Sequence, residues 1–297
     1  MNIGLGAVQF GLDYGISGVR KKTPQTEVVQ LLEFATIQGM HVLDTAPSYG
    51  DSEDVIGKFI RSHDNRSHWN IVTKTPYFKN KIISSKQIDE LISSFELSRK
   101  KLGLDMLYGL LIHNYDNLFS TGGDKLLQAM IQLKKKKVVK KIGVSVYSSK
   151  QIDHILDCFP NSIDLVQLPF SILDQRLLKG GQLNRLKECG VEIHARSVFL
   201  QGLLFMPLEI LPSWFNPIME TLEAFHMEAK KRNMSALQLA IGFVQSVHEI
   251  DKIIVGVNTL KQLDEIIKAS SIYVDLKQFS SLSINNPAFL DPSNWRV

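Results

Sequence analysis

Residues 39–53 read GMHVLDTAPSYGDSE, and this stretch shows the unit from which the fold is expected to be built. A short apolar run leads into Asp44, a turn follows, and an amphipathic stretch with helical spacing begins at Ser52. The apolar residues are consecutive rather than alternate, which is typical of a strand in a parallel sheet that is covered on both faces. We therefore predict a strand, a loop and a helix in this order.

The same alternation continues along the chain and yields eight strand–helix units. Spread over 297 residues, eight units take about 37 residues each, which is enough for a strand, a crossover helix and their connections. Eight such units close naturally into a TIM barrel, so we predict an α/β fold with a single (β/α)8 barrel domain over residues 1–297. An open doubly wound sheet is the competing architecture. The strands are expected at Asn2–Val8, Met40–Thr45, Asn70–Thr75, Met106–His113, Lys141–Val146, Asp164–Leu168, Val191–Ser197 and Lys252–Val257.

Several helix ends carry recognisable capping residues. Ser84 and Gln87 have the spacing of a capping box, and Gly39 and Gly103 stand where a helix-terminating glycine belongs. The stretch from Gln201 to Asn216 is expected to be a long loop after the seventh strand. Further helices are expected at Ser52–His63, Asp124–Lys136, Ser148–Cys158, Gly181–Cys189, Pro217–Arg232, Ser235–His248 and Thr259–Ala269.

Composition and charge exclude several classes of protein. Hydrophobic residues make up 44% of the chain and charged residues 22%, which is ordinary for a globular protein and excludes a disordered chain. The net charge of +4 is too small for this length to indicate nucleic acid or a membrane surface as a partner. A small-molecule substrate is the remaining expectation.

The cysteines, the histidines and the hydropathy of the chain indicate its cellular compartment and exclude certain disulfide and metal sites. The two cysteines, Cys158 and Cys189, exclude a disulfide scaffold and a four-cysteine zinc or iron–sulfur site. The eight histidines are scattered, so no metal site is expected. No apolar run approaches the roughly 18 residues of a membrane span, and Met1–Gly15 lacks the basic region of a signal peptide. A soluble cytoplasmic protein is expected, and the sequence carries no signal for its oligomeric state.

Three successive strands of the predicted barrel each end in an ionisable residue, namely Asp44, Lys74 and His113. Active sites of such barrels lie at the C-terminal ends of the strands, and adjacent strands are about 4.8 Å apart. We therefore expect these side chains to converge, with Tyr49 folding over the same opening from the loop after Asp44. Each residue alone has a structural explanation, but an Asp and a Lys at buried strand ends need partners.

Together these four residue types can donate a proton to a carbonyl oxygen. A tyrosine phenol has a pKa of about 10, and a nearby ammonium lowers that pKa because it favours the phenolate. The carboxylate keeps the lysine charged and fixed, and a histidine can stabilise negative charge that develops on the substrate oxygen. The chain itself carries no hydride donor, so a bound reductant is also required.

Residues 39–53 resemble the signature around the catalytic Asp and Tyr of the aldo-keto reductase superfamily. Lys74 and His113 stand where the other two catalytic residues of that family fall, and the resemblance covers nearly the whole chain. It implies a (β/α)8 barrel and NAD(P)H-dependent reduction of aldehydes and ketones. It further implies that Tyr49 is the general acid, that Lys74 and Asp44 tune it, and that His113 orients the carbonyl.

The resemblance also implies a set of cofactor-binding residues. Ser145 and Gln167 match residues that bind the nicotinamide carboxamide, although the Asn that follows the Ser in the family is Val146 here. Arg196 stands where the family usually has an aromatic residue stacked on the nicotinamide; a guanidinium can also stack on a ring, and its charge would favour an anionic group in the substrate pocket. The expected cofactor-binding residues are Ser145, Gln167, Arg196, Ser197, Phe199, Gln201, Gly202, Gly256, Asn258, Gln262 and Glu265.

The resemblance implies NADPH as the cofactor, with NADH as the alternative. In the family, a basic residue and an Arg after the eighth strand bind the adenosine 2′-phosphate. Here those places are taken by Asn258 and Gln262, both neutral, and Lys261 is the only nearby cation. Discrimination between NADPH and NADH is therefore predicted to be weaker than is usual in the family.

Two other functions stay open, and the substrate is defined only as a class. The chain could be an NAD(P)-binding accessory or regulatory barrel subunit without turnover, or a barrel enzyme that forms a Schiff base at Lys74. Residues 8–15 and the segment around Arg196 resemble a bacterial branch of the superfamily associated with surface-polysaccharide or sugar metabolism, which favours a sugar-derived carbonyl. The loops expected to set specificity are Phe10–Lys22, Pro76–Ile82, Asn114–Gly123 and Gln201–Pro217.

Overall fold

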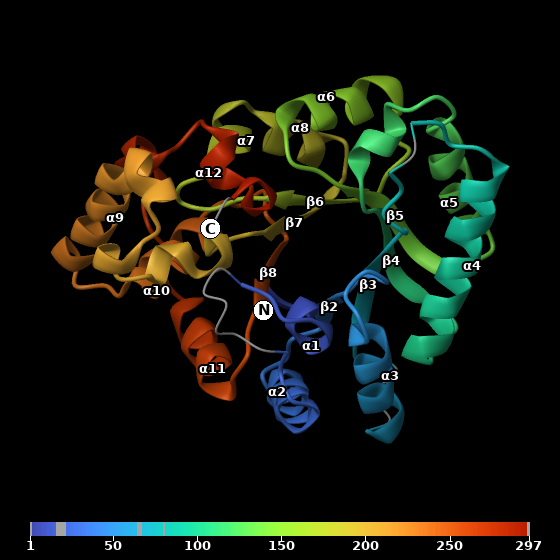
Figure 1. Cartoon of the computed structure of the whole chain (residues 1–297), viewed down its shortest axis with the longest axis horizontal. Helices are drawn as coiled ribbons and strands as arrows, with labels where there is room; N and C mark the ends of the chain where they lie inside the picture. The colour runs from blue at the N-terminus through green and yellow to red at the C-terminus, as the bar shows by residue number, and fades with distance from the viewer. Residues whose placement is uncertain (1, 16–21, 64–66, 80, 296–297) are drawn as a thin grey trace.

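The computed structural model describes residues 2–15, 22–63, 67–79 and 81–295. Eight parallel strands pair in chain order, and β1 also pairs with β8, so the sheet closes into a barrel that the helices surround (Figure 1). The predicted (β/α)8 barrel is confirmed, and the open sheet is excluded. The strands are β1 (Ile3–Gly6), β2 (Val42–Asp44), β3 (Asn70–Lys74), β4 (Leu107–Ile112), β5 (Val139–Ser145), β6 (Leu165–Pro169), β7 (Glu192–Arg196) and β8 (Lys252–Gly256).

Burial on both faces explains why the strands are continuous apolar runs. Side chains that point outward join one large core with the helices, whereas Val72, Leu111 and Leu165 form a small cluster within the barrel. The inside of the barrel is crowded enough to require glycine at Gly143, where a Cβ would lie 1.7 Å from the carbonyl oxygen of Leu165. Glycine at this position thus lets the neighbouring strand backbone approach closely.

The predicted helices occur in the predicted order, and the capping of two of them agrees with the prediction. The short helices at Val8–Gly11, Arg176–Lys179 and Pro287–Leu290 were not predicted, and the first strand ends at Gly6 rather than at Val8. Ser84 and Gln87 form the capping box at the start of α4, and Gly103 ends that helix in the left-handed conformation with φ +71°. Gly39 likewise has φ +74° directly after the C-cap of α2. The α-helices are α1 (Val8–Gly11), α2 (Gln25–Ile37), α3 (Ser52–Ser62), α4 (Ser85–Leu102), α5 (Asp124–Lys135), α6 (Ser149–Cys158), α7 (Arg176–Lys179), α8 (Gln182–Glu188), α9 (Met219–Lys231), α10 (Ala236–Gln245), α11 (Leu260–Ala269) and α12 (Pro287–Leu290).

The stretch expected to be a long loop after β7 is more ordered than predicted. It contains three 3-10 helices, η2 (Leu200–Phe205), η3 (Leu208–Ile210) and η4 (Ser213–Ile218). Pro207 and Pro212 occupy the N-cap positions of η3 and η4, where a residue without an N–H loses no helical hydrogen bond. Helices of one or two turns are too short to leave a periodic pattern in the sequence.

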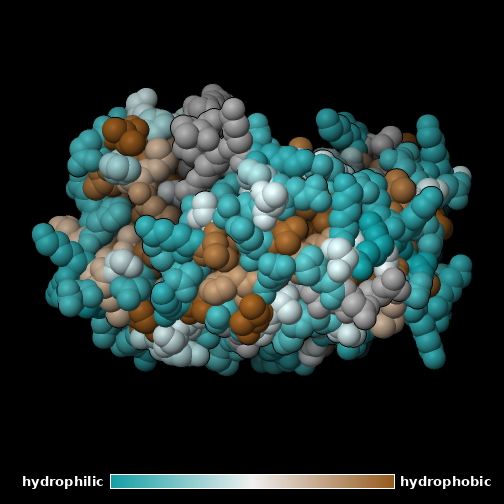
Figure 2. Space-filling view, turned by 90° about the horizontal axis from the view of Figure 1, so that it is seen from below, coloured by the Kyte–Doolittle hydropathy of each residue, from teal (hydrophilic) through white to brown (hydrophobic). Residues whose placement is uncertain are grey.

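The chain after α11 returns across the barrel and packs beside α7, where α12 is visible in Figure 1. The N–H of Ile284 donates to the carbonyl of Leu173 at 2.8 Å, and the Gln175 amide donates to the carbonyl of Phe279 at 2.8 Å. On the face drawn in Figure 2, hydrophobic residues form separate spots in a mostly hydrophilic surface. Within the described part of the chain, none of the helices combines the length and the hydropathy needed to cross a membrane.

Candidate active site

The four residues predicted to converge at the strand ends do so, and we call Asp44, Tyr49, Lys74 and His113 the cavity cluster. The Lys74 ammonium donates to both Asp44 carboxylate oxygens, at 2.7 and 2.8 Å, and to the carbonyl of Thr45 at 3.0 Å. The same nitrogen lies 4.8 Å from the centroid of the Tyr49 ring. The His113 and Tyr49 rings meet edge to face with centroids 6.0 Å apart. The phenol, the ammonium, the carboxylate and the imidazole therefore share one site.

Two glycines hold the loop that carries Tyr49 against the start of the chain. A Cβ on Gly11 would lie 1.8 Å from the Tyr49 carbonyl oxygen, and a Cβ on Gly50 would lie 2.4 Å from the Gly11 carbonyl oxygen. Gly50 also has φ +60°, a conformation that favours glycine. The Ser52 hydroxyl then donates to the Ala7 carbonyl at 2.9 Å and ties α3 to β1. The loop is thereby fixed from both ends.

Charge and burial set the protonation of the lysine and the tyrosine. Burial opposes the charged form of Lys74, but Asp44 and Tyr49 raise its pKa above the ordinary value, so the lysine is an ammonium. Burial also raises the pKa of Tyr49, and the Lys74 charge opposes this rise without reversing it. The ammonium was expected to lower the pKa of the phenol, but the loss of hydration in the buried site outweighs its effect. Tyr49 is therefore protonated at neutral pH.

His113 is a neutral imidazole at the end of β4. Burial and then the charges of Lys74 and Arg196 lower its pKa from 6.5 to about 3. Its backbone N–H donates to the Thr75 hydroxyl at 3.2 Å, and its Nδ1 is buried without a hydrogen-bond partner among the described residues. A neutral imidazole can present one N–H donor to a ligand oxygen.

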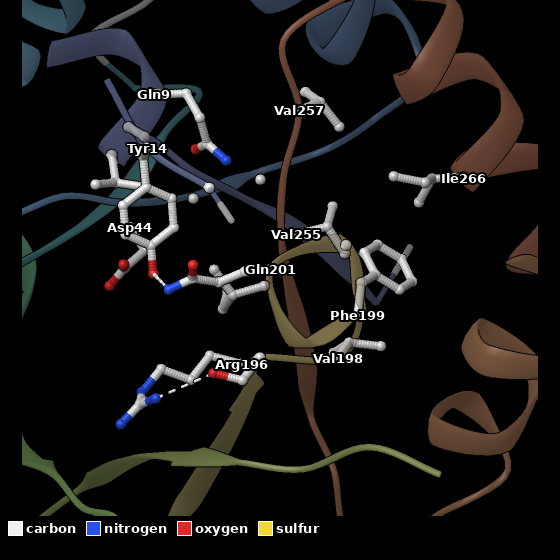
Figure 3. A pocket seen from close by; sticks show the side chains of 18 of the residues that line it. Gln9, Tyr14, Asp44, Arg196, Val198, Phe199, Gln201, Val255, Val257 and Ile266 are labelled. Carbon is white, nitrogen blue, oxygen red and sulfur yellow. Dashed lines mark hydrogen bonds between the residues drawn. The ribbon is translucent and has the colours of Figure 1, made fainter. Parts of the chain in front are cut away.

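These residues line a cavity of about 420 Å³ at the C-terminal ends of the strands. Its walls include every residue predicted for catalysis or cofactor binding except Asn258. Figure 3 shows Asp44, Tyr14 and Arg196 around one end, and Val198, Phe199, Val255, Val257 and Ile266 around the other. The cavity thus has a polar end at the cavity cluster, and toward β8 and α11 its wall combines apolar side chains with Gln262 and Glu265.

Gln167 and Ser145, expected at the carboxamide, lie beside the cavity cluster. The Gln167 amide nitrogen donates to Asp44 Oδ1 at 2.7 Å, so this side chain also holds the carboxylate that holds Lys74. Ser145 ends β5 and lies opposite Gln167 in the register of β5 and β6. Both residues are almost fully buried and line the cavity.

Arg196 ends β7, and its guanidinium stacks on a tyrosine of this chain. The guanidinium carbon lies 4.1 Å from the centroid of the Tyr147 ring. Its Nη2 donates to the Val146 carbonyl and its Nη1 to the Ser197 hydroxyl, both at 3.2 Å. The side chain is therefore held in place at the polar end of the cavity.

The turn after β7 has an unusual backbone at the predicted cofactor residues. Leu200, Gln201 and Gly202 follow one another with φ values of +46°, +54° and +95°, and Ser197 has φ +58°. Left-handed conformations at residues other than glycine cost free energy and concentrate at binding sites. The Gln201 amide donates to the Tyr14 hydroxyl at 3.1 Å and joins this turn to the segment after α1 (Figure 3).

The segment between β8 and α11 departs in part from the prediction. Asn258 does not line the cavity, because its amide nitrogen donates to the Thr23 hydroxyl at 3.2 Å. Gln262 and Glu265 do line it, and the Gln262 side chain accepts from the Asn258 backbone N–H at 2.8 Å. The Lys261 ammonium is highly exposed and lies 3.9 Å from a Glu265 carboxylate oxygen. A carboxylate rather than a cation thus faces this end of the cavity.

Among the lining residues that were not predicted as site residues, three have polar side chains. Gln9 reaches the cavity from α1, and its side-chain oxygen is buried without a hydrogen-bond partner among the described residues (Figure 3). Tyr14 and Tyr147 stand at the polar end. Tyr14 belongs to the predicted specificity loop Phe10–Lys22, of which residues 16–21 lie outside the described part. Tyr147 is the second residue after β5, a position that could have drawn attention to it.

The same four residue types meet a second time inside the barrel, and we call Tyr108, Lys141, Glu192 and His194 the basal cluster. Glu192 accepts from the Tyr108 hydroxyl at 2.7 Å, interacts with His194 Nε2 at 2.7 Å and accepts from the Lys141 ammonium. Burial favours the protonated acid, but these hydrogen bonds hold the pKa of Glu192 well below its ordinary value. The basal cluster does not line the cavity. Among the described residues, no three His, Cys, Asp or Glu side chains are grouped to hold a metal.

Comparison with known proteins gives a consistent relationship. The sequence model of the Aldo/keto reductase family matches residues 2–285. Aldo-keto reductase YhdN of Bacillus subtilis (strain 168) is 26% identical over 159 residues, which cover 52% of this chain and about half (47%) of YhdN. Aldo-keto reductase str7 of Strobilurus tenacellus is 26% identical over 264 residues, covering 83% of this chain and 77% of str7. L-galactose dehydrogenase of Arabidopsis thaliana is 24% identical over 280 residues, covering 90% and 83%.

Solved structures show the same fold. The holo form of aldo-keto reductase AKR11C1 from Bacillus halodurans superposes with a TM-score of 0.74 at 17% sequence identity. The superposition covers 95% of this chain and 92% of that structure. At this identity the likeness supports the barrel and not a shared substrate.

Proposed function

Because the chain belongs to the aldo/keto reductase family, we propose that it uses NAD(P)H to reduce an aldehyde or ketone, with Tyr49 as the proton donor. The observation that carries the proposal is the Lys74 ammonium, which is fixed on Asp44 and lies 4.8 Å from the centroid of the Tyr49 ring. Lys74 and Tyr49 line the same cavity, whose volume is about 420 Å³.

The polar groups around the cavity fit a nicotinamide dinucleotide. Ser145 and the oxygen of Gln167 would hold the carboxamide, since the Gln167 nitrogen is already bonded to Asp44. The left-handed turn around Gln201 and Gly202 would bring backbone N–H groups to the pyrophosphate, and the space beside the Gly202 Cα is open. The unpartnered oxygen of Gln9 would accept a hydrogen bond from a ribose hydroxyl.

Tyr49 would transfer its proton to the carbonyl oxygen as the carbon accepts a hydride. The hydride comes from the dihydronicotinamide ring of NAD(P)H when that cofactor is bound. Lys74 stabilises the phenolate that forms at Tyr49, and Asp44 keeps Lys74 charged and in place. Neutral His113 donates an N–H to the substrate oxygen and orients it toward the phenol. The carbonyl group is thereby reduced to an alcohol, because its carbon gains the hydride and its oxygen gains the proton.

The same geometry argues against a Schiff base at Lys74. A nucleophilic lysine must be an uncharged amine, whereas the pKa of Lys74 is raised and its ammonium donates to Asp44 and to the Thr45 carbonyl. Treatment with borohydride in the presence of carbonyl compounds is therefore expected to leave the chain unmodified. A covalent adduct at Lys74 would reject the reductase mechanism.

The adenosine of the cofactor would lie at the end of the cavity near β8 and α11. The charged residues there support weak discrimination against NADH. Lys261 is directed to Glu265 rather than into the cavity, and Glu265 itself lines the cavity. A carboxylate near the 2′ position disfavours a phosphate there. We expect dissociation constants for NADPH and NADH that differ by less than about tenfold. A preference for NADPH above about a thousandfold, roughly 4 kcal/mol, would contradict this part of the proposal.

A carbonyl panel tests the proposed function. Purified protein is mixed with NADPH or NADH and with keto-sugars, simple aldehydes and simple ketones, while oxidation of the cofactor is followed by absorbance. Oxidation that depends on the carbonyl compound is the expected result. Tight binding of NAD(P)H without turnover of any carbonyl would instead favour an accessory or regulatory barrel.

A further inference from the structure

The guanidinium of Arg196 is fixed on three sides before any ligand binds. One face lies on the Tyr147 ring, with 4.1 Å between the guanidinium carbon and the ring centroid. Two of its N–H groups donate to the Val146 carbonyl and the Ser197 hydroxyl. A guanidinium has five N–H donors, so others remain for a ligand in the cavity that Arg196 lines.

The direction of this side chain places its charge near the substrate rather than near the cofactor phosphates. Arg196 ends β7, but it bonds to Val146, which directly follows β5, so the side chain crosses the end of β6. The next strand in that direction is β4, which leads to His113. The residues expected near the adenosine and the 2′ position lie on the other side, after β8.

Arg196 also brings an unbalanced positive charge to the polar end. The Lys74 ammonium is neutralised by Asp44 at 2.7 Å. No Asp or Glu of the described chain forms an ion pair with Arg196, whose protein partners are a carbonyl and a hydroxyl. The other groups there, Tyr49 and His113, are neutral at neutral pH. Arg196 is half-buried, so its charge is partly withdrawn from water and gains from a ligand that supplies a counterion.

We propose that Arg196 recognises a carboxylate on the substrate, so that the preferred substrates are aldehydes or ketones that also carry a carboxylate group. This inference rests on the proposed carbonyl reduction. A planar guanidinium fits a carboxylate with two parallel hydrogen bonds. One unpaired cation balances one negative charge, which favours a carboxylate over a doubly charged phosphate ester. The Tyr147 ring keeps the Arg196 guanidinium oriented, so little side-chain entropy is lost when a carboxylate binds.

The test compares three probes of similar shape: 4-carboxybenzaldehyde, the neutral 4-formylbenzamide and 4-formylphenyl phosphate. Values of kcat/KM are measured with saturating cofactor for the wild type, Arg196→Gln and Arg196→Lys. Arg185→Gln is the charge-matched control, because Arg185 pairs with Asp153 and Asp157 and does not line the cavity. Binding of the corresponding carboxylate and amide alcohols is measured by calorimetry with the cofactor present.

The wild type is expected to favour the carboxylate over the amide by at least about tenfold, the usual scale of a charge-assisted hydrogen bond. In Arg196→Gln this ratio should fall below about threefold, Arg196→Lys should keep part of it, and Arg185→Gln all of it. Equal use of acid and amide by the wild type, or an unchanged ratio in Arg196→Gln, would overturn the inference. A phosphate preferred more than about tenfold over the carboxylate would also overturn it. If the alcohol that carries the carboxylate binds in an Arg196-dependent way but no aldehyde is turned over, the anion site is retained and the proposed function is rejected.

Discussion

Two clusters in the barrel each bring together a phenol, an ammonium, a carboxylate and an imidazole, and of the two only the cavity cluster lines the cavity at the strand ends. In both clusters a lysine lies over a tyrosine ring, with 4.8 Å from its nitrogen to the ring centroid in the cavity cluster and 5.3 Å in the basal cluster. In both, that lysine is bound to a carboxylate. The cavity cluster consists of Asp44, Tyr49, Lys74 and His113, and the basal cluster of Tyr108, Lys141, Glu192 and His194.

The two clusters differ in where the tyrosine proton is directed. In the basal cluster the Tyr108 hydroxyl donates to Glu192 at 2.7 Å, so its proton is held within the protein. In the cavity cluster Asp44 accepts from Lys74 and Gln167 instead, and Tyr49 lines the cavity. Residue types alone therefore do not identify a proton donor. The tyrosine must also lie at the C-terminal ends of the strands, where a ligand can reach it.

The largest expected difference between the clusters is in the effect of removing the lysine. Lys74→Met should lower kcat by at least about a hundredfold, because the main charge that stabilises a phenolate at Tyr49 is then lost. Lys141→Met should lower kcat by less than about threefold. Steady-state kinetics with the best carbonyl substrate, after thermal melting has shown that both variants are folded, checks this. Equal losses in the two variants would remove the distinction between the clusters.

A smaller effect, on stability rather than activity, is expected from Glu192→Gln. The variant loses charge-assisted hydrogen bonds and should lower the free energy of unfolding by about 2 kcal/mol at neutral pH, or about 4 °C in Tm. Because the pKa of Glu192 is lowered in the folded state, the stabilisation exists above about pH 4.5 and is lost as the pH falls below it. Thermal melts of both proteins between pH 3 and 7 should therefore converge at low pH. A gap that is constant with pH would mean that the carboxylate charge contributes nothing.

The smallest expected effect is the pH dependence that His113 contributes to activity. Its pKa of about 3 keeps it neutral, so kcat/KM should change by less than about twofold between pH 5 and 8. In the same range stability should fall as the pH drops below about 6.5, since only the unfolded chain then takes up a proton at this residue. An inflection in kcat/KM near pH 6.5 that disappears in His113→Gln would contradict the neutral assignment.

The cavity cluster was predictable because Asp44 and Lys74 end buried strands, His113 directly follows one, and Tyr49 lies in the loop after β2. An ionisable side chain at a buried strand end, such as Asp44 or Lys74, cannot reach solvent and must find partners nearby. The basal cluster was missed because Lys141 and Glu192 lie near the starts of their strands, where charged residues are ordinary. Their meeting depends on the register of three strands, which the sequence does not display.

Local signals explain the remaining successes and errors. The capping box of Ser84 and Gln87 was recognised, and the same Ser-x-x-Gln pattern also starts α6 and α10. Asn258 was expected at the cofactor, and its amide nitrogen donates to the hydroxyl of Thr23 just before α2, a pairing between neighbouring segments that the sequence does not display. The stacking of Arg196 on Tyr147 could not be predicted, since it requires a side chain to cross β6.

The central claim is that Tyr49, and not another group of this chain, supplies the proton to the carbonyl oxygen. Single-turnover oxidation of bound NAD(P)H by a carbonyl substrate, compared among the wild type, Tyr49→Phe and Tyr108→Phe, tests it most directly. We predict a rate at least about a hundredfold lower in Tyr49→Phe, with cofactor affinity within about threefold of the wild type, and a nearly normal rate in Tyr108→Phe. A Tyr49→Phe rate equal to that of the wild type would contradict the account.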